Sequence, residues 1–201
     1  MLQPAMTAGA SIPAWLPNAI SALRILLVPV WLGVALEAEG AADRTSRQLA
    51  LVAILIALGL SDVLDGFIAR RFELSSNLGA TLDAVADKIA QVTTVTYLAL
   101  RGGDPLTPLP VWLLLTLLLR DLLLLMGFLL IRLRRGHVAV QHDWHGKLSS
   151  LLLFALTLAA TLSAPEDLVE LASVAVVALV VPSTISYVHA GWKQLSSPST
   201  P

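Results

Sequence analysis

The stretch that decides the fold covers residues 61–88 and reads SDVLDGFIARRFELSSNLGATLDAVADK. It contains four aspartates, which are Asp62, Asp65, Asp83 and Asp87. The twelve residues directly before it, LALVAILIALGL at positions 49–60, carry no charge. Ionisable side chains are costly inside an apolar membrane helix and usually have a function there. Four carboxylates in this setting therefore indicate a functional site rather than four unrelated helix caps.

The composition of the chain is that of a membrane protein. Its 201 residues are 56% hydrophobic and 13% charged, whereas an average soluble domain is about 25% charged. The mean hydropathy is +0.78. The net charge of −1 provides no basic field for nucleic acid, and the lack of cysteine excludes disulfides and thiolate metal sites. The first basic residue is Arg24, so we expect no cleaved signal peptide.

Apolar segments that could cross a bilayer recur six times along the chain. A spanning helix needs about 20 mostly apolar residues. The expected spans are 20–36, 49–69, 79–100, 109–133, 147–164 and 168–190. We therefore predict an all-α polytopic membrane protein with six transmembrane helices, built as a single domain over residues 1–195. Residues 1–18 are expected to form a juxtamembrane segment, and residues 196–201 a disordered tail.

The basic residues of the connections predict the orientation of these spans. Seven lie on the side that the chain termini would share, namely Arg70, Arg71, Arg132, Arg134, Arg135, Lys147 and Lys193. Three lie on the other side, namely Arg44, Arg47 and Arg101. The side richer in Lys and Arg is normally cytoplasmic. The aspartates are then expected at the cytoplasmic ends of the second and third spans, in the cell inner membrane or its equivalent.

The spacing of the aspartates places them in pairs on helix faces. Asp62 and Asp65 are three residues apart, and Asp83 and Asp87 are four apart. A short loop joins the two spans, so we expect antiparallel neighbours with all four carboxylates at similar depth. Such carboxylates repel one another unless they are protonated or neutralised by cations. Clustered oxygen ligands suit hard divalent ions such as Mg²⁺, Mn²⁺ or Ca²⁺.

Other residues of the aspartate-rich stretch and the first span could complete such a site. Gly66 and Gly79 would let a ligand or another backbone approach closely. Arg70 could hold a phosphate, or it could act only as a topology determinant. Arg24 lies near the cytoplasmic end of the first span, with Asn18 on a compatible face.

Charged residues beside and beyond these spans allow more than one interpretation. Arg120 and Asp121 either form an ion pair that holds the bundle together or line a polar cavity that opens to the cytoplasm. Lys147, at the start of the fifth span, is a candidate phosphate ligand. Lys88 follows Asp87 directly, and the simplest interpretation pairs these two side chains.

The aspartate spacing resembles the signature of the CDP-alcohol phosphatidyltransferase family. The signature positions, matched without a gap, read Asp62-x-x-Asp65-Gly66-x-x-Ala69-Arg70, eight residues, then Gly79-x-x-x-Asp83-x-x-x-Asp87. The six expected spans also resemble that family. The resemblance implies transfer of a phosphatidyl group from a CDP-linked donor to an alcohol at the cytoplasmic membrane face, with release of CMP. It also implies two divalent cations, Mg²⁺ or Mn²⁺.

The resemblance implies a role for each motif residue. Asp62, Asp65 and Asp83 would be metal ligands, while Asp87 would lie near the second ion and act as general base for the acceptor hydroxyl. The residues implied for the donor are Gly66, Ala69 and Gly79 beside the nucleotide and Arg70 on a phosphate. The possible acceptor or phosphate contacts are Asn18, Arg24, Arg120 and Lys147.

Two segments outside the motif bear on the alcohol acceptor. LPNAISALRILLVPV at 16–30 resembles both the cardiolipin synthase and the phosphatidylglycerophosphate synthase branches, and LPVWLLLTLLLRDLLLL at 109–125 looks more like the first. The implied substrates are CDP-diacylglycerol and phosphatidylglycerol, with glycerol 3-phosphate as the alternative acceptor, and a homodimer is also implied. Ala84 replaces a proline of many relatives, and GKLSS at 146–150 also departs from the usual pattern.

Two alternatives from other functional classes remain open. The first is an ion-coupled transporter that uses the aspartates as cation sites, and the lack of an internal repeat counts against it. The second is a membrane scaffold without catalytic activity.

Overall fold

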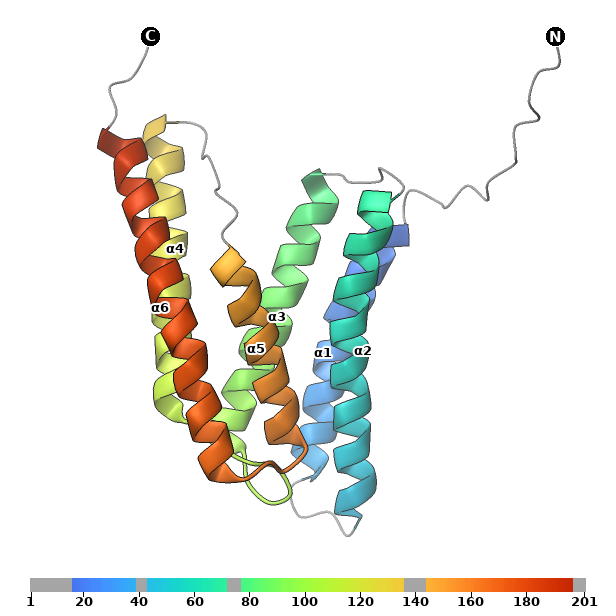
Figure 1. Cartoon of the computed structure of the whole chain (residues 1–201). Helices are drawn as coiled ribbons and strands as arrows, with labels where there is room; N and C mark the ends of the chain where they lie inside the picture. The colour runs from blue at the N-terminus through green and yellow to red at the C-terminus, as the bar shows by residue number, and fades with distance from the viewer. Residues whose placement is uncertain (1–15, 39–42, 72–76, 136–143, 197–201) are drawn as a thin grey trace, which may run out of the picture.

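The chain folds into six α-helices, and the described residues contain no strand (Figure 1). The computed structural model describes residues 16–38, 43–71, 77–135 and 144–196. The helices are α1 (Leu16–Ala38), α2 (Arg44–Arg71), α3 (Asn77–Arg101), α4 (Val111–Arg135), α5 (Trp144–Thr161) and α6 (Glu166–Ser196). The predicted all-α fold with six helices is therefore confirmed.

Some predicted site residues fall outside the described side chains. They are Asn18, Asp65, Gly66, Ala69, Arg70 and Lys147. All six belong to helices.

Four helices among the described residues are long and apolar enough to cross a membrane by themselves. Their apolar stretches are Ala19–Ala38, Arg44–Leu64, Val111–Arg134 and Glu166–Lys193. In α5 the apolar part is shorter, Leu148–Thr161. Helix α3 carries Asp83, Asp87 and Lys88 in its first half. Membrane crossing by α3 and α5 stays a prediction that depends on their position inside the bundle.

The start of two helices is set by local chemistry. Asp43 precedes α2, and its Oδ1 accepts a hydrogen bond from the backbone N–H of Ser46 at 3.2 Å, which is the contact of an N-cap. Helix α4 begins at Val111 rather than at the predicted residue 109. Pro110 disfavours the helical conformation of Leu109 before it, so the helix does not extend further back. The Pro110 carbonyl accepts a hydrogen bond from Leu113 N at 3.0 Å.

Helix α5 ends earlier than predicted, at Thr161 rather than at residue 164. Ser163 has a φ of 61°, in the left-handed region that commonly follows a helix C-terminus. The N–H of Ala164 then turns back to the carbonyl of Ala159 at 3.0 Å. This turn directs the chain into α6.

The six helices pack as two groups of three. Helix α1 packs against α2 and α3, and α6 packs against α4 and α5, while fewer contacts join the groups. Trp31 of α1 is fully buried, and its ring meets that of Tyr97 of α3 edge to face, with centroids 5.6 Å apart. The Tyr97 hydroxyl donates to the carbonyl of Ala35 at 2.7 Å. This aromatic pair fixes α1 against α3.

One end of the bundle is tied by hydrogen bonds between loops. Gln48 Nε2, in the first turns of α2, donates to Thr161 O at 2.9 Å and to Ser163 Oγ at 2.6 Å. Thr107, between α3 and α4, donates through Oγ1 to Ala164 O at 2.6 Å. Figure 1 shows the helices closer together at this end than at the opposite end, where α1 begins and α6 ends. The motif residues lie toward the wider end.

Candidate functional site

A buried arginine joins three helices at the wider end of the bundle. The side chain of Arg24, on α1, is 1% exposed. Its Nη1 lies 2.7 Å from Asp83 Oδ1 on α3 and 3.2 Å from Asp62 Oδ1 on α2. Its Nε donates to Ser61 Oγ at 3.3 Å. A buried guanidinium needs such compensation, because its desolvation is otherwise costly. Arg24 is therefore the structural centre of the aspartate cluster.

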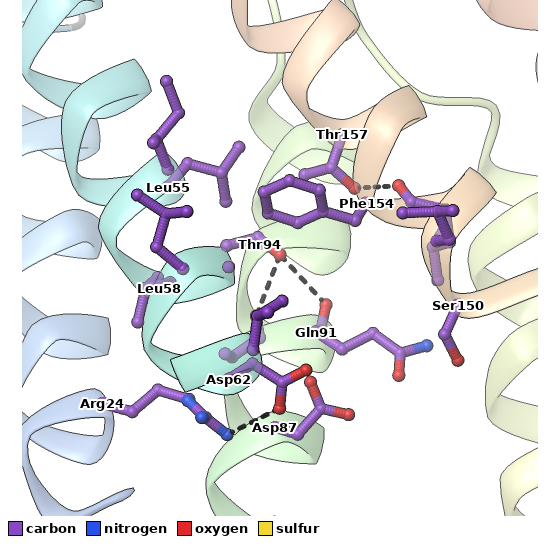
Figure 2. A pocket seen from close by; sticks show the side chains of 17 residues that line it. Arg24, Leu55, Leu58, Asp62, Asp87, Gln91, Thr94, Ser150, Phe154 and Thr157 are labelled. Carbon is purple, nitrogen blue, oxygen red and sulfur yellow. Dashed lines mark hydrogen bonds and ion pairs between the residues drawn. The ribbon is translucent and has the colours of Figure 1, made fainter. Parts of the chain in front are cut away.

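Asp87 faces the same region from α3, one turn beyond Asp83. Figure 2 shows its carboxylate beside that of Asp62, and both residues line one cavity. The structure thus brings together Asp62, Asp83 and Asp87 from two helices. Gly79 lies in the first turn of α3, one turn before Asp83.

The described side chains do not form a ready metal cluster. Among them, no group of three His, Asp or Glu residues is arranged to hold a metal ion. The guanidinium of Arg24 contacts both Asp62 and Asp83, so it offsets their charge where a cation would otherwise do so. The ligand atoms nevertheless fit a metal site. Carboxylate oxygens on two helices beside one cavity are the ligands that hard divalent cations take.

A cavity of about 540 Å³ extends from the carboxylates between α2, α3 and α5 (Figure 2). Asp62 and Asp87 lie at its polar end, and Leu55, Leu58 and Phe154 line its deeper part. Asp62 and Leu55 are seven residues apart on α2, which corresponds to about 10 Å of helix. The cavity therefore leads from a charged end into a mostly apolar interior, in which a few polar side chains such as Gln91 and Thr94 also lie.

The rim of this cavity is apolar and exposed. Leu60 and Val63 of α2 and Leu151 of α5 line the cavity, and each side chain is more than half exposed. A wide apolar surface of this kind is stable where lipid, not water, surrounds it. The cavity is therefore bordered on its α2 and α5 sides by residues suited to face the bilayer.

A glycine of α2 lets an aromatic ring of α5 pack close against it in the cavity wall. A Cβ placed on Gly59 of α2 would lie 2.5 Å from Cζ of Phe154 on α5. Only a glycine leaves room for this ring. Gly59 and Phe154 both line the cavity, so this contact is part of its wall.

A second charged group lies between α3 and α4. Lys88 Nζ donates to Asp121 Oδ2 at 3.0 Å and Oδ1 at 3.2 Å, and also to Gln91 Oε1 at 2.9 Å. Arg120 Nη1 lies 3.2 Å from Asp121 Oδ1. The predicted pairing of Lys88 with Asp87 was therefore wrong.

The ion-pair interpretation of Arg120 and Asp121 is confirmed by these contacts. Neither residue lines the cavity beside Asp62, so the alternative of a polar cavity lining is not supported for this cavity. Sequence reasoning did not single out Gln91 or Phe154. Gln91 could have been found, because it follows Asp87 by four residues and shares its helix face. Phe154 gave no signal, because its partner lies on another helix.

The sequence is similar to several known proteins. It matches the CDP-alcohol phosphatidyltransferase family over residues 14–186. It is 38% identical over 131 residues to a candidate cardiolipin synthase of Mycobacterium tuberculosis, covering 65% of this chain and 56% of that protein. It is 35% identical over 144 residues to the CMP-forming cardiolipin synthase of Streptomyces coelicolor, covering 71% and 63%. It is 32% identical over 176 residues to a candidate phosphatidylglycerophosphate synthase of Mycobacterium tuberculosis, covering 83% and 78%.

The match thus spans little more than half the length of the first of these relatives and less than two thirds of the second. Similarity to both kinds of synthase leaves the alcohol acceptor open.

Proposed function

This chain belongs to the CDP-alcohol phosphatidyltransferase family, and from this premise we propose that it transfers a phosphatidyl group from CDP-diacylglycerol to an alcohol and releases CMP. One observation carries the proposal. The family motif lies without a gap on α2 and α3, and its carboxylates Asp62, Asp83 and Asp87 gather at the charged end of a cavity with an apolar interior. Family membership favours this activity over an ion-coupled transporter or a scaffold.

The shape of the cavity suits a substrate that is part nucleotide and part lipid. The polar end beside Asp62 and Asp87 would receive the pyrophosphate, and the interior beside Leu55 and Phe154 would receive hydrocarbon. By its place in the motif, Arg70 would contact a donor phosphate. Gly66, Ala69 and Gly79 would leave room for the cytidine nucleotide.

We propose that the four motif aspartates bind two divalent cations, Mg²⁺ or Mn²⁺. Members of the family generally depend on divalent cations. Bound cations would supply positive charge that neutralises the pyrophosphate and stabilises the attacking and leaving oxygens. Arg24 contributes one fixed positive charge to the same carboxylates through its contacts with Asp62 and Asp83.

Asp87 is the general base of the proposed reaction. Its carboxylate faces the cavity, where it could accept the proton of the acceptor hydroxyl. The acceptor oxygen then forms a bond to the phosphorus of the phosphatidyl group. The bond from that phosphorus to the oxygen of CMP breaks, and CMP leaves.

We propose phosphatidylglycerol as the acceptor, which makes cardiolipin the product. The exposed apolar rim formed by Leu60, Val63 and Leu151 would admit a second lipid directly from the bilayer. Glycerol 3-phosphate is the alternative, since one relative bears the name of a phosphatidylglycerophosphate synthase. Its phosphate, or that of a lipid acceptor, would contact residues from the set Asn18, Arg24, Arg120 and Lys147.

The test is an assay on the purified full-length chain in lipid nanodiscs with CDP-diacylglycerol, Mn²⁺ and each acceptor in turn. We expect CMP release and cardiolipin when phosphatidylglycerol is supplied, loss of both on chelation, and recovery with Mg²⁺ or Mn²⁺. Formation of phosphatidylglycerophosphate instead would correct the acceptor. Absence of CMP with both acceptors would contradict the transferase.

We further propose a homodimer in the cell inner membrane or its equivalent, with residues 1–195 as one catalytic domain and the active site facing the cytoplasm. The orientation rests on the charge difference between the two ends of the helices.

A further inference from the structure

Gln91 is a polar side chain of the cavity to which the proposed reaction gives no role. It follows Asp87 by four residues on α3, so the two side chains share one face of the helix. Both line the cavity between α2, α3 and α5. Figure 2 shows the Gln91 side chain extending from α3 toward α5 near Ser150. Gln91 therefore presents an amide to the cavity one turn deeper than the carboxylate of Asp87.

The orientation of this amide is fixed by chemistry. Lys88 Nζ lies 2.9 Å from Gln91 Oε1. An ammonium group can only donate, so the atom that faces it must be the amide oxygen. Gln91 Nε2 then carries the two donor hydrogens away from Lys88. No described residue accepts a hydrogen bond from Nε2, which leaves these donors available to a molecule in the cavity.

Lys88 is itself held in place by α4. Its Nζ contacts both carboxylate oxygens of Asp121, at 3.0 and 3.2 Å, and Arg120 Nη1 contacts Oδ1 of the same carboxylate at 3.2 Å. Charge-assisted contacts of this kind are stronger than neutral ones. The series Arg120, Asp121 and Lys88 therefore holds the Gln91 amide in one orientation.

The depth of Gln91 indicates which group of a substrate it meets. One helical turn is about 5.4 Å, so the Gln91 backbone lies about that far along α3 from the Asp87 backbone, toward the membrane interior. In an acylglycerol phosphate, the ester carbonyls follow the phosphate by a few bonds on the hydrocarbon side. A carbonyl oxygen is an acceptor without a hydrogen, so it matches a side chain that offers donors.

We propose that Gln91 Nε2 donates a hydrogen bond to an ester carbonyl of an acylglycerol lipid in the cavity, and that Lys88 and Asp121 are positioning residues for this contact. The inference rests on the proposed function for the identity of the lipid. It makes Gln91 a specificity-determining residue that distinguishes ester-linked from ether-linked chains.

The test compares diester and diether forms of CDP-diacylglycerol with the same chain lengths. A net hydrogen bond of the usual strength corresponds to about a five- to tenfold preference for the diester in kcat/KM. Gln91→Met keeps the length of the side chain without the donor, so the preference should fall to about one. Thr116→Val, on α4 and away from the cavity, is the control and should retain the full preference.

The positioning role of Lys88 is tested separately, through its effect on the KM of the diester. Lys88→Met should lower the preference for the diester by raising the KM of the diester alone, and Lys88→Arg should restore part of it. A Lys88→Met variant that loses rate equally with both lipids would overturn the positioning role. Repeating the assay with diester and diether phosphatidylglycerol as acceptor shows whether the carbonyl belongs to the donor or to the acceptor.

A binding measurement separates this inference from the proposed function. Thermal stabilisation of the protein by each lipid is recorded in nanodiscs without turnover. If no CMP forms but the diester stabilises wild type more than Gln91→Met, the transferase fails and the ester contact stands. Equal stabilisation and equal rates with diester and diether in wild type would overturn the contact. A preference that persists in Gln91→Met would overturn it as well.

Discussion

At the scale of single residues, the site depends on the balance of buried charge around Arg24. Its guanidinium is 1% exposed, whereas the Asp62 and Asp83 side chains that it contacts are 50% and 40% exposed. The arginine thus reduces the repulsion between two carboxylates on different helices. The same contacts join α1, α2 and α3 at the charged end of the cavity.

We expect Arg24→Met to destabilise the protein by roughly 3 kcal/mol. This value is at the lower end of the cost of removing one partner of a buried ion pair, because the two carboxylates stay partly hydrated. Thermal unfolding in detergent with EDTA measures this loss. Added Mn²⁺ should recover more stability in the variant than in wild type. Arg132→Met, on the exposed end of α4, is the control and should unfold as wild type does. Identical unfolding of Arg24→Met and wild type would argue against the charge-balance role.

Asp87→Asn tests the general base. The amide cannot take the acceptor proton, so kcat should fall at least about 100-fold, while binding of CDP-diacylglycerol is retained. Steady-state CMP release and a lipid-binding assay report the two quantities. Asp167→Asn, on the exposed start of α6, makes the same change outside the site and should leave kcat unchanged. A wild-type rate in Asp87→Asn would remove Asp87 as the base.

Residues of the site could be predicted from the sequence only in part. The paired spacing of the aspartates indicated a shared site, because helix faces follow from periodicity. Arg24 was expected near this site from its depth in the first span. Its contacts with Asp62 and Asp83 could not be derived from periodicity, since they come from a different helix. The pairing of Lys88 with Asp87 was wrong because adjacent residues point about 100° apart on a helix. Asp87 therefore faces α2, and Lys88 faces α4.

At the scale of helices, the cavity depends on how closely α2 approaches α5. The ring of Phe154 occupies the space that a side chain at Gly59 would need. Gly59→Ala would push the ring, which is the free end of a flexible side chain, into the cavity. We expect a several-fold rise in the KM for CDP-diacylglycerol with a folded protein, measured by CMP release. Gly33→Ala, where a Cβ would meet nothing within 4 Å, is the matched control.

A second substitution shows whether the effect comes from the ring. Phe154→Leu removes it, so the double variant Gly59→Ala, Phe154→Leu should regain most of the lost affinity. An unchanged KM in Gly59→Ala, or a double variant no better than the single one, would show that this contact does not set the cavity width.

Helices were the easiest elements to predict, because long apolar runs have few alternatives in a bilayer. Their ends were harder. Helix α5 stops at Thr161 because Ser163 adopts a left-handed conformation, which no apolar pattern encodes. The membrane character of α3 was also harder to judge, because its charged residues are neutralised by α1 and α4 rather than within its own sequence.

At the scale of the whole molecule, the orientation in the membrane can be tested because the chain has no cysteine. Single cysteines would be introduced at Leu133 of α4, near the wider end of the bundle, and at Thr45 of α2, near the opposite end. Both positions are exposed. A membrane-impermeant maleimide applied to intact cells should label Thr45→Cys. It should label Leu133→Cys only after the membrane is opened.

The unsubstituted chain is the blank for this labelling, and enzyme activity shows that each variant is folded. Labelling of Leu133→Cys in intact cells would place the aspartates on the outer side and contradict the proposed orientation.

The hydrogen bonds of Gln48 and Thr107 have a mechanical consequence. They lock together the turns on both sides of the interface between the two helix triplets, far from the motif carboxylates. If α5 tilted away from α2, these hydrogen-bonded turns would be the fixed point of the movement. The distance between α2 and α5 would then increase most at the level of Asp62 and least near Gln48 and Thr107. A bulky lipid could enter and leave in this way while the fold stays intact.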